Sequence, residues 1–262
     1  MNTIKLNNLS IEYEVKGTGT PLVFLHGLGG DTSQIHSVYH PIDHIQLINI
    51  NLPGHGHSEA DYNNYCFNSL AANVIAILQS LNIKKAYFAG ISMGAAIATT
   101  IAIQYPKYVI ELICIRPAWT HHAMGALVQK AYTSLATSLS RNSLDDFMNS
   151  QGFSIVNNTT NYTRNTFLHT FEEVNNLREW KKFEILPFDK PYTTISELES
   201  IDIYTTIIAC KDDFVHPYEY AEEYHKHIKN SNLIEIPNKD TDPILHNQII
   251  NDVLKERLKV NP

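Results

Sequence analysis

The chain has 262 residues, of which 44% are apolar and 18% are charged, so its composition argues against disorder and supports a sizeable core. The formal net charge of -7 argues against a general nucleic-acid or anionic-membrane binder, because such surfaces need clustered Lys and Arg. The cysteines lie far apart without metal-ligand spacing, which favours reduced thiols and a cytoplasmic location (Cys66, Cys114, Cys210).

The first part of the chain alternates predicted strands with predicted helices. Residues 3–6 and 11–15 predict a hairpin turned at Asn7 and Asn8. The uncharged stretch 86–106 is long enough for a membrane span, but its glycines and polar residues favour a buried strand, a turn and a buried helix. The alternation implies right-handed crossovers and a mostly parallel sheet. The other elements predicted here are strands at residues 21–25, 44–51, 85–91 and 109–115 and helices at residues 67–81 and 93–104.

The middle of the chain, residues 118–200, shows helical patterns and no convincing buried strand. We interpret this segment as a helical cap inserted into a core that consists of residues 1–117 and 201–262. Within the cap, the pattern predicts helices at residues 126–139, 144–151 and 165–180. Beyond it, the alternation resumes with strands at residues 203–210 and 233–236 and helices at residues 218–228 and 247–258.

The pentapeptide GISMG at residues 90–94 fits the pattern G-x-S-x-G, with Ser92 as its serine. It follows a predicted strand and opens a predicted helix, as a nucleophile elbow requires. The flanking glycines matter because side chains beside the serine would collide in so tight a turn. At a helix N-terminus, free backbone N–H groups also favour developing negative charge. The pattern therefore predicts Ser92 as a catalytic nucleophile.

A second glycine-rich segment, HGLGG at residues 26–30, follows the first buried strand. Acyl transfer needs two backbone donors directed at the oxyanion, and the N–H groups of Leu28 and Met93 would supply them. A phosphate-binding loop is the alternative, but neither G-x-G-x-x-G nor G-K-[ST] is present. We interpret His26 as a structural hydrogen-bonding residue rather than as a base.

These two segments, together with LPGHGHS at residues 52–58, make the chain similar to the α/β-hydrolase superfamily. The likeness covers roughly residues 10–118 well and residues 200–260 more loosely. The resemblance implies an eight-stranded sheet, a helical cap after the sixth strand, and the chain order Ser, acid, His. In that family the middle loop usually begins with Asp, where this chain has Asn51.

The resemblance also assigns the acid and the base of a triad. In similar proteins the acid lies four residues before a proline in the loop after the seventh strand, which selects Asp213, with Asp212 as the alternative. The base is expected after the last strand, where His246 is the only histidine. Residues 238–242 lack the usual Gly-His, so His246 comes late in this loop. Three histidines precede that strand, and the last two of them are expected on an exposed helix (His216, His225, His227).

We therefore expect a two-step acyl transfer, in which His246 accepts the proton of Ser92 and Asp213 orients His246. No metal or organic cofactor is needed. The apolar cap favours a small or medium-sized, partly apolar substrate with an ester-like bond, and we expect neither a nucleic-acid nor a membrane partner. The alternatives are a lactonase, thioesterase, carbon–carbon hydrolase or peptidase on the same triad, or a ligand-binding regulator that retains it.

Overall fold

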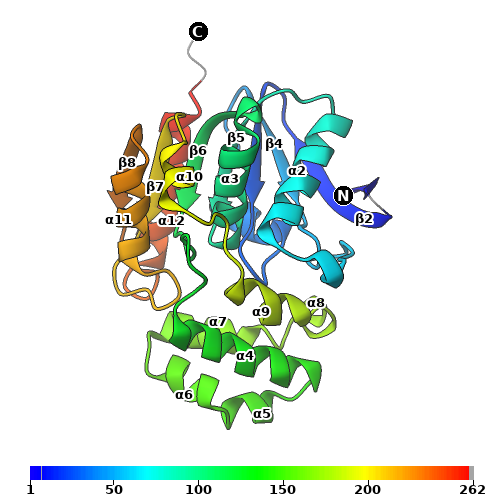
Figure 1. Ribbon diagram of the computed structural model, residues 1–262, viewed down its shortest axis with the longest axis vertical. Helices are drawn as coiled ribbons and strands as arrows, with labels where there is room; N and C mark the ends of the chain where they lie inside the picture. Colours follow the sequence, from blue (N-terminus) through cyan, green and yellow to red (C-terminus); the bar gives the residue numbers. More distant parts are fainter. Residues whose placement is uncertain (7, 260–262) are drawn as a thin grey trace.

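The computed structural model describes residues 1–6 and 8–259, and within these residues eight strands form one sheet (Figure 1). The strand order is β1-β2-β4-β3-β5-β6-β7-β8; β2 runs antiparallel to both neighbours and all pairs from β4 to β8 are parallel. This confirms the predicted eight-stranded, mostly parallel sheet. The strands are β1 (Asn2–Leu6), β2 (Leu9–Lys16), β3 (Thr20–Leu25), β4 (Ile45–Ile50), β5 (Ala86–Ile91), β6 (Val109–Ile115), β7 (Thr205–Ala209) and β8 (Ser231–Glu235).

The predicted N-terminal hairpin is confirmed by the antiparallel pairing of β1 with β2, in which Leu6 lies opposite Leu9. Of the two residues expected to form its turn, Asn7 lies outside the described residues. Asn8 has a φ of 69°, a left-handed conformation that asparagine adopts more readily than most residues do.

Helices cover both faces of the sheet because each central strand is apolar on both sides. Along β3, Leu22 and Phe24 face one core cluster and Val23 and Leu25 face the other, as expected for alternating side chains. One cluster is completed by α1 and α12, and the other by α2, α3 and α11. The bounds are α1 (Thr32–Val38), α2 (Phe67–Ser80), α3 (Met93–Gln104), α10 (Ile195–Glu199), α11 (Tyr218–His227), α12 (Pro243–Arg257), η1 (Tyr62–Asn64), η2 (Pro106–Tyr108) and η3 (Leu186–Phe188).

The uncharged stretch 86–106 forms β5, a sharp turn and the buried helix α3, as predicted. Over the described part of the chain, none of the helices combines the length and the apolar character that a membrane crossing demands.

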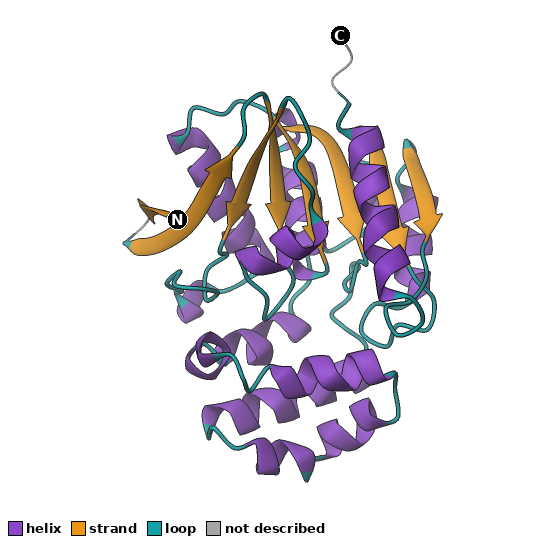
Figure 2. Cartoon of the chain, turned by 180° about the vertical axis from the view of Figure 1, so that it is seen from behind, coloured by secondary structure: helices purple, strands orange, loops and turns teal. Residues whose placement is uncertain are grey.

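Of the helices that the chain forms between β6 and β7, the first six α-helices, α4 to α9, are called the cap helices below, and they lie beyond the ends to which the parallel strands point (Figure 2). The helix predicted over residues 165–180 is wrong: two shorter helices form, because the chain turns at residues 170–173 and Glu173 is extended. The cap helices are α4 (Ala126–Ser140), α5 (Leu144–Met148), α6 (Gln151–Asn157), α7 (Asn161–His169), α8 (Val174–Arg178) and α9 (Lys181–Ile185).

Candidate active site

Ser92 lies between β5 and α3 in a backbone conformation that few residues with side chains adopt, with φ 54° and ψ -110°. The turn is tight enough to exclude side chains at both flanking glycines. A Cβ on Gly90 would lie 2.2 Å from the carbonyl carbon of Gly94, and a Cβ on Gly94 would lie 2.2 Å from the carbonyl oxygen of Leu25. The strain therefore serves to present the Ser92 hydroxyl at the carboxyl end of the sheet.

His216, in the loop after β7, lies within hydrogen-bonding distance of Ser92. Its Nε2 atom is 2.9 Å from the Ser92 Oγ atom, and its Nδ1 atom is 2.9 Å from the Asp213 Oδ1 atom. With its Nδ1 proton donated to the carboxylate, the neutral imidazole presents a lone pair at Nε2 to the serine hydroxyl. The structure thus brings Ser92 and Asp213 together through His216.

Arg116, the first residue after β6, holds the other oxygen of the Asp213 carboxylate. Its Nε and Nη2 atoms donate to Asp213 Oδ2 at 2.9 and 2.7 Å, and Nη2 lies 3.1 Å from His216 Nδ1. Burial opposes the ionisation of Asp213, but His216 and the Arg116 guanidinium hold the pKa of the carboxyl well below its usual value. The carboxylate is therefore charged and fixed in orientation.

The pKa of His216 is lowered from its ordinary value mainly because the ring is buried, and the positive charge of Arg116 lowers it further. The negative charge of Asp213 opposes both effects. A histidine in this environment is neutral at neutral pH and able to accept a proton, which is the state that a general base needs.

His246, the expected base, does not lie between Ser92 and Asp213. It falls within the first turn of α12 rather than in the preceding loop, and its backbone N–H donates to the Asp242 carbonyl. Its ring is 1% exposed, and its Nδ1 atom is 2.8 Å from the Pro237 carbonyl oxygen. Burial lowers the pKa of His246 to about 4. The side chain therefore connects the segment after β8 to α12. His246 comes late in the segment after the last strand, as the sequence indicated, because it already belongs to α12.

The segment expected to form the oxyanion hole lies next to Ser92, because a Cβ on Gly27 would lie 3.5 Å from the Ser92 Cβ. In the described part of the chain, the amides of Leu28 and Met93 donate no hydrogen bond to another protein group. Both donors therefore remain available to a ligand. Their role as an oxyanion hole stays a prediction.

Two buried histidines hold this segment in place. The Leu52 amide donates to His26 Nε2 at 3.1 Å, and the Gly29 amide donates to His55 Nε2 at 3.2 Å. Burial lowers the pKa of His26 to about 4 and places that of His55 well below the ordinary value. Both rings are therefore neutral acceptors, and the structural role expected for His26 is confirmed.

The cap helices α8 and α9 are attached to the same loops. Asn176 Nδ2 donates to the Gly29 carbonyl at 3.1 Å, and the buried Lys182 ammonium donates to the Gly54 carbonyl at 2.7 Å. Burial lowers the pKa of Lys182 to about 7. The turn at residues 170–173, which the sequence did not reveal, directs these side chains toward the core.

A small cavity of about 80 Å³ lies over Ser92 between the sheet and the cap helices. Its size admits only a few non-hydrogen atoms, because ligand pockets for drug-sized molecules are several times larger. Its wall combines the aromatic rings of tyrosine and phenylalanine residues with hydroxyl groups and the guanidinium group of Arg116. The lining residues are Gly27, Leu28, Gln34, Ile91, Ser92, Arg116, Tyr132, Tyr162, Thr163, Thr166, Phe167, Asp213, Val215 and His216.

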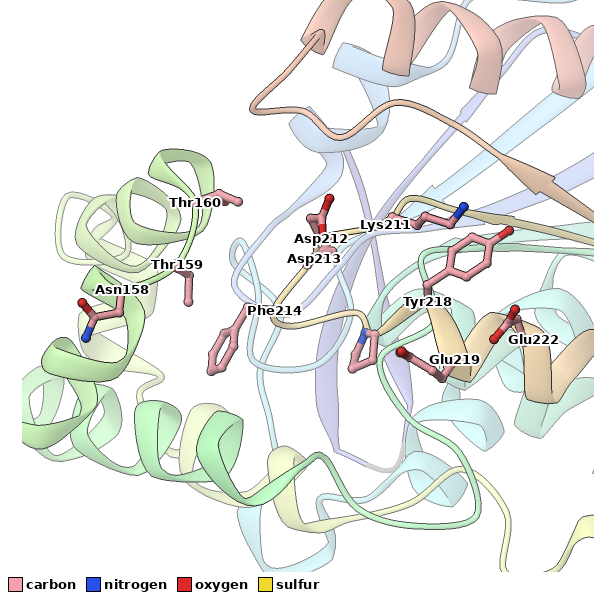
Figure 3. A pocket seen from close by; sticks show the side chains of 11 residues that line it. Asn158, Thr159, Thr160, Lys211, Asp212, Asp213, Phe214, Tyr218, Glu219 and Glu222 are labelled. Atoms are coloured by element: carbon pink, nitrogen blue, oxygen red, sulfur yellow. The ribbon is translucent and has the colours of Figure 1, made fainter.

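A wider cleft of about 870 Å³ lies between the α6–α7 turn and the loop that leads from β7 into α11 (Figure 3). Asp213 lines both hollows, and Phe214 projects into the cleft toward the cap (Figure 3). The acidic side chains of Asp212, Glu219 and Glu222 lie along the cleft and outnumber its one lysine, Lys211, so the cleft is negatively charged.

Two residues of this arrangement were not singled out as site residues by the sequence. His216 follows Asp213 by three positions, a spacing that lets one turn hold both side chains, and residues 238–242 lack the usual Gly-His. Together these two features were the available signal for His216. Arg116 had no comparable signal, since a single Arg after a strand indicates nothing by itself.

Comparisons with known proteins identify the family and the fold. Residues 20–240 match the family described as alpha/beta hydrolase fold. The crystal structure of MGS-M2, an alpha/beta hydrolase enzyme from a Medee basin deep-sea metagenome library, has a TM-score of 0.79 and 17% identity and covers 100% of this chain and 98% of its own. This structural likeness concerns the fold alone.

Two curated relatives each match slightly less than half of the chain. An (E)-2-((N-methylformamido)methylene)succinate hydrolase of Acinetobacter baylyi is 30% identical over 131 residues, 48% of this chain and 49% of that protein. The sn-1-specific diacylglycerol lipase ABHD11 of Danio rerio is 31% identical over 122 residues, 44% of this chain and 37% of that protein. The chain thus spans less than half the length of these relatives.

Proposed function

The chain belongs to the alpha/beta hydrolase fold family, and from this premise we propose that it is a serine hydrolase that cleaves an ester bond of a small substrate. The observation that carries the proposal is the contact of 2.9 Å between Ser92 Oγ and His216 Nε2, with Asp213 on the far side of the imidazole. The lipase name of the Danio rerio relative is consistent with ester cleavage.

In the first step, Ser92 Oγ attacks the ester carbonyl while His216 Nε2 accepts the hydroxyl proton. Asp213 stabilises the imidazolium that forms and keeps the Nδ1 proton on its side of the ring. The amides of Leu28 and Met93 donate to the oxyanion of the tetrahedral intermediate. The imidazolium then protonates the leaving alkoxide, and an acyl-enzyme remains on Ser92.

In the second step, water takes the place of the alcohol. His216 accepts a proton from the water as it attacks the acyl carbonyl, and returns it to Ser92 Oγ when the acid leaves. The inner cavity holds the acyl group during both steps, so its size favours short acyl chains.

A fluorophosphonate probe together with short-chain p-nitrophenyl esters tests the proposal. The wild-type protein should be labelled and should hydrolyse the esters, whereas Ser92→Ala should lose labelling and lower kcat on the order of 10⁶-fold. Ser140→Ala is the matched control, since this exposed hydroxyl donates to the Thr137 carbonyl and, in the described part of the chain, has no other partner. A wild-type protein that the probe does not label at Ser92 would contradict the proposal.

A further inference from the structure

Tyr162, at the start of α7, contributes a hydroxyl group near Ser92 that lacks an acceptor. The residue lines the inner cavity, and the Lys239 ammonium donates to its Oη atom at 3.3 Å. Because Lys239 occupies an acceptor site of the oxygen, the hydroxyl proton is left for a different partner. Within the described residues, this proton has no acceptor.

Two cations flank the Tyr162 ring. Lys239 Nζ lies 5.2 Å and the Arg116 guanidinium 5.8 Å from the ring centre. Burial raises the pKa of the Tyr162 hydroxyl, but Lys239 and Arg116 more than offset that effect, so the pKa is lowered overall. The potential at this end of the cavity therefore favours a negative charge.

The charges around the cavity do not cancel. The Arg116 guanidinium is paired with the Asp213 carboxylate at 2.7 Å, and His216 is neutral, so the net charge of these three groups is zero. Lys239 is half-buried, and among the described residues no carboxylate oxygen lies within 4.0 Å of its ammonium. Asp240 is the acid next to it in the chain, but its Oδ1 accepts from the Tyr162 amide and the residue is exposed. One positive charge thus remains beside the cavity.

We propose that the inner cavity selects a short acyl group ending in a carboxylate, which accepts from the Tyr162 hydroxyl and is attracted by Lys239. The substrate class is accordingly a half-ester of a short dicarboxylic acid, cleaved at the ester that faces Ser92. This inference rests on the proposed function, because it names the acyl group that the same serine would accept. The wider cleft is excluded as the anion site, since Asp212, Glu219 and Glu222 line it.

A matched pair of substrates tests the inference. Monomethyl succinate and methyl isocaproate have the same skeleton, and they differ in carrying a carboxylate or an isopropyl group at the far end. The wild-type kcat/KM should be about 10- to 100-fold higher for the anionic ester, which corresponds to one hydrogen bond to a charged group. Release of methanol measures both rates.

Variants of Lys239 and Tyr162 assign the preference to these side chains. Lys239→Met and Tyr162→Phe should each reduce the ratio of the two kcat/KM values about tenfold, whereas Lys239→Arg should retain most of it. Lys255→Met, on the exposed side of α12, is the control for the lost charge and should leave the ratio as in the wild type. A ratio that does not respond to Lys239→Met overturns the inference.

The outcomes separate this inference from the proposed function. Hydrolysis of both esters with no preference for the anion would overturn the inference and leave the serine hydrolase intact. Absence of fluorophosphonate labelling at Ser92 would instead overturn the proposed function. If the probe labels Ser92 but neither ester is hydrolysed, each ester can be tested for how strongly it slows the labelling of Ser92. Stronger protection by the anionic ester would support the inference, and equal protection by the two esters would contradict it.

Discussion

His216 Nε2 lies 2.9 Å from Ser92 Oγ although 124 positions separate the two residues in the chain. The contact is possible because Ser92 follows β5 and His216 follows β7, with only β6 between these parallel strands. Arg116 follows β6 itself and contacts Asp213 and His216 in the loop after β7. Loops at the carboxyl ends of adjacent parallel strands meet at one edge of the sheet, which is where such sites form.

Matched substitutions should identify the histidine that acts as the base. His216→Asn should lower kcat on the order of 10⁶-fold, because Ser92 then loses its proton acceptor. His246→Asn should change kcat per folded molecule only a few-fold, since its ring contacts the Pro237 carbonyl rather than Ser92. Steady-state kinetics of both variants provide the measurement, and a large loss of kcat in His246→Asn alone would favour His246 as the base.

The same His246→Asn variant should be less stable than the wild type. The shorter amide cannot reach the Pro237 carbonyl in the way the ring does, and loss of the donor to this partly buried acceptor should cost about 1 kcal/mol. Urea denaturation at neutral pH measures the free energy of unfolding. A variant as stable as the wild type would show that this hydrogen bond contributes nothing.

Removal of the Arg116 charge should change the pH dependence of catalysis. Arg116 lowers the pKa of His216, so Arg116→Gln should move the acid limb of the kcat/KM profile to higher pH. Arg116→Lys keeps the charge and should move the limb less. An acid limb at the same pH in all three proteins would mean that His216 does not respond to Arg116.

The elbow glycines should not tolerate a methyl group. In Gly94→Ala the new Cβ would lie 2.2 Å from the Leu25 carbonyl oxygen, and backbone must shift to relieve the overlap. We expect a loss of stability of about 3 kcal/mol or more, or failure to fold. Gly125→Ala is the control, because the nearest atom to its Cβ, the Tyr220 hydroxyl oxygen, is 3.9 Å away. Thermal unfolding compares the variants.

The protein should lose stability as the pH falls from about 6.5 to about 4. His26 and His246 have pKa values of about 4 in the folded protein against 6.5 for an ordinary histidine. In this window the unfolded chain binds protons that the folded chain does not, so the free energy of unfolding decreases by up to about 1.4 kcal/mol per pH unit for each histidine. Urea denaturation at several pH values should show the decrease, and His246→Asn should make it less steep.

Much of the fold was predictable because its signals are local. Short apolar runs rich in β-branched residues, such as residues 109–115, are typical of strands buried between helices, and α3 begins at the serine elbow. The cap helix predicted over residues 165–180 was wrong, because the turn at residues 170–173 is favoured by contacts of α8 and α9 with distant loops. Such contacts leave no periodic signal in the sequence.

The place of Ser92 in a tight strand-to-helix turn was predictable from the sequence alone, because the steric demands of such a turn are set by five neighbouring residues. The choice between His216 and His246 belonged to the tertiary structure. Both follow strands at the same edge of the sheet, and their distance from Ser92 depends on where α12 begins and how the loop after β7 turns. Those features follow from long-range packing, so no local pattern could decide which imidazole reaches the serine.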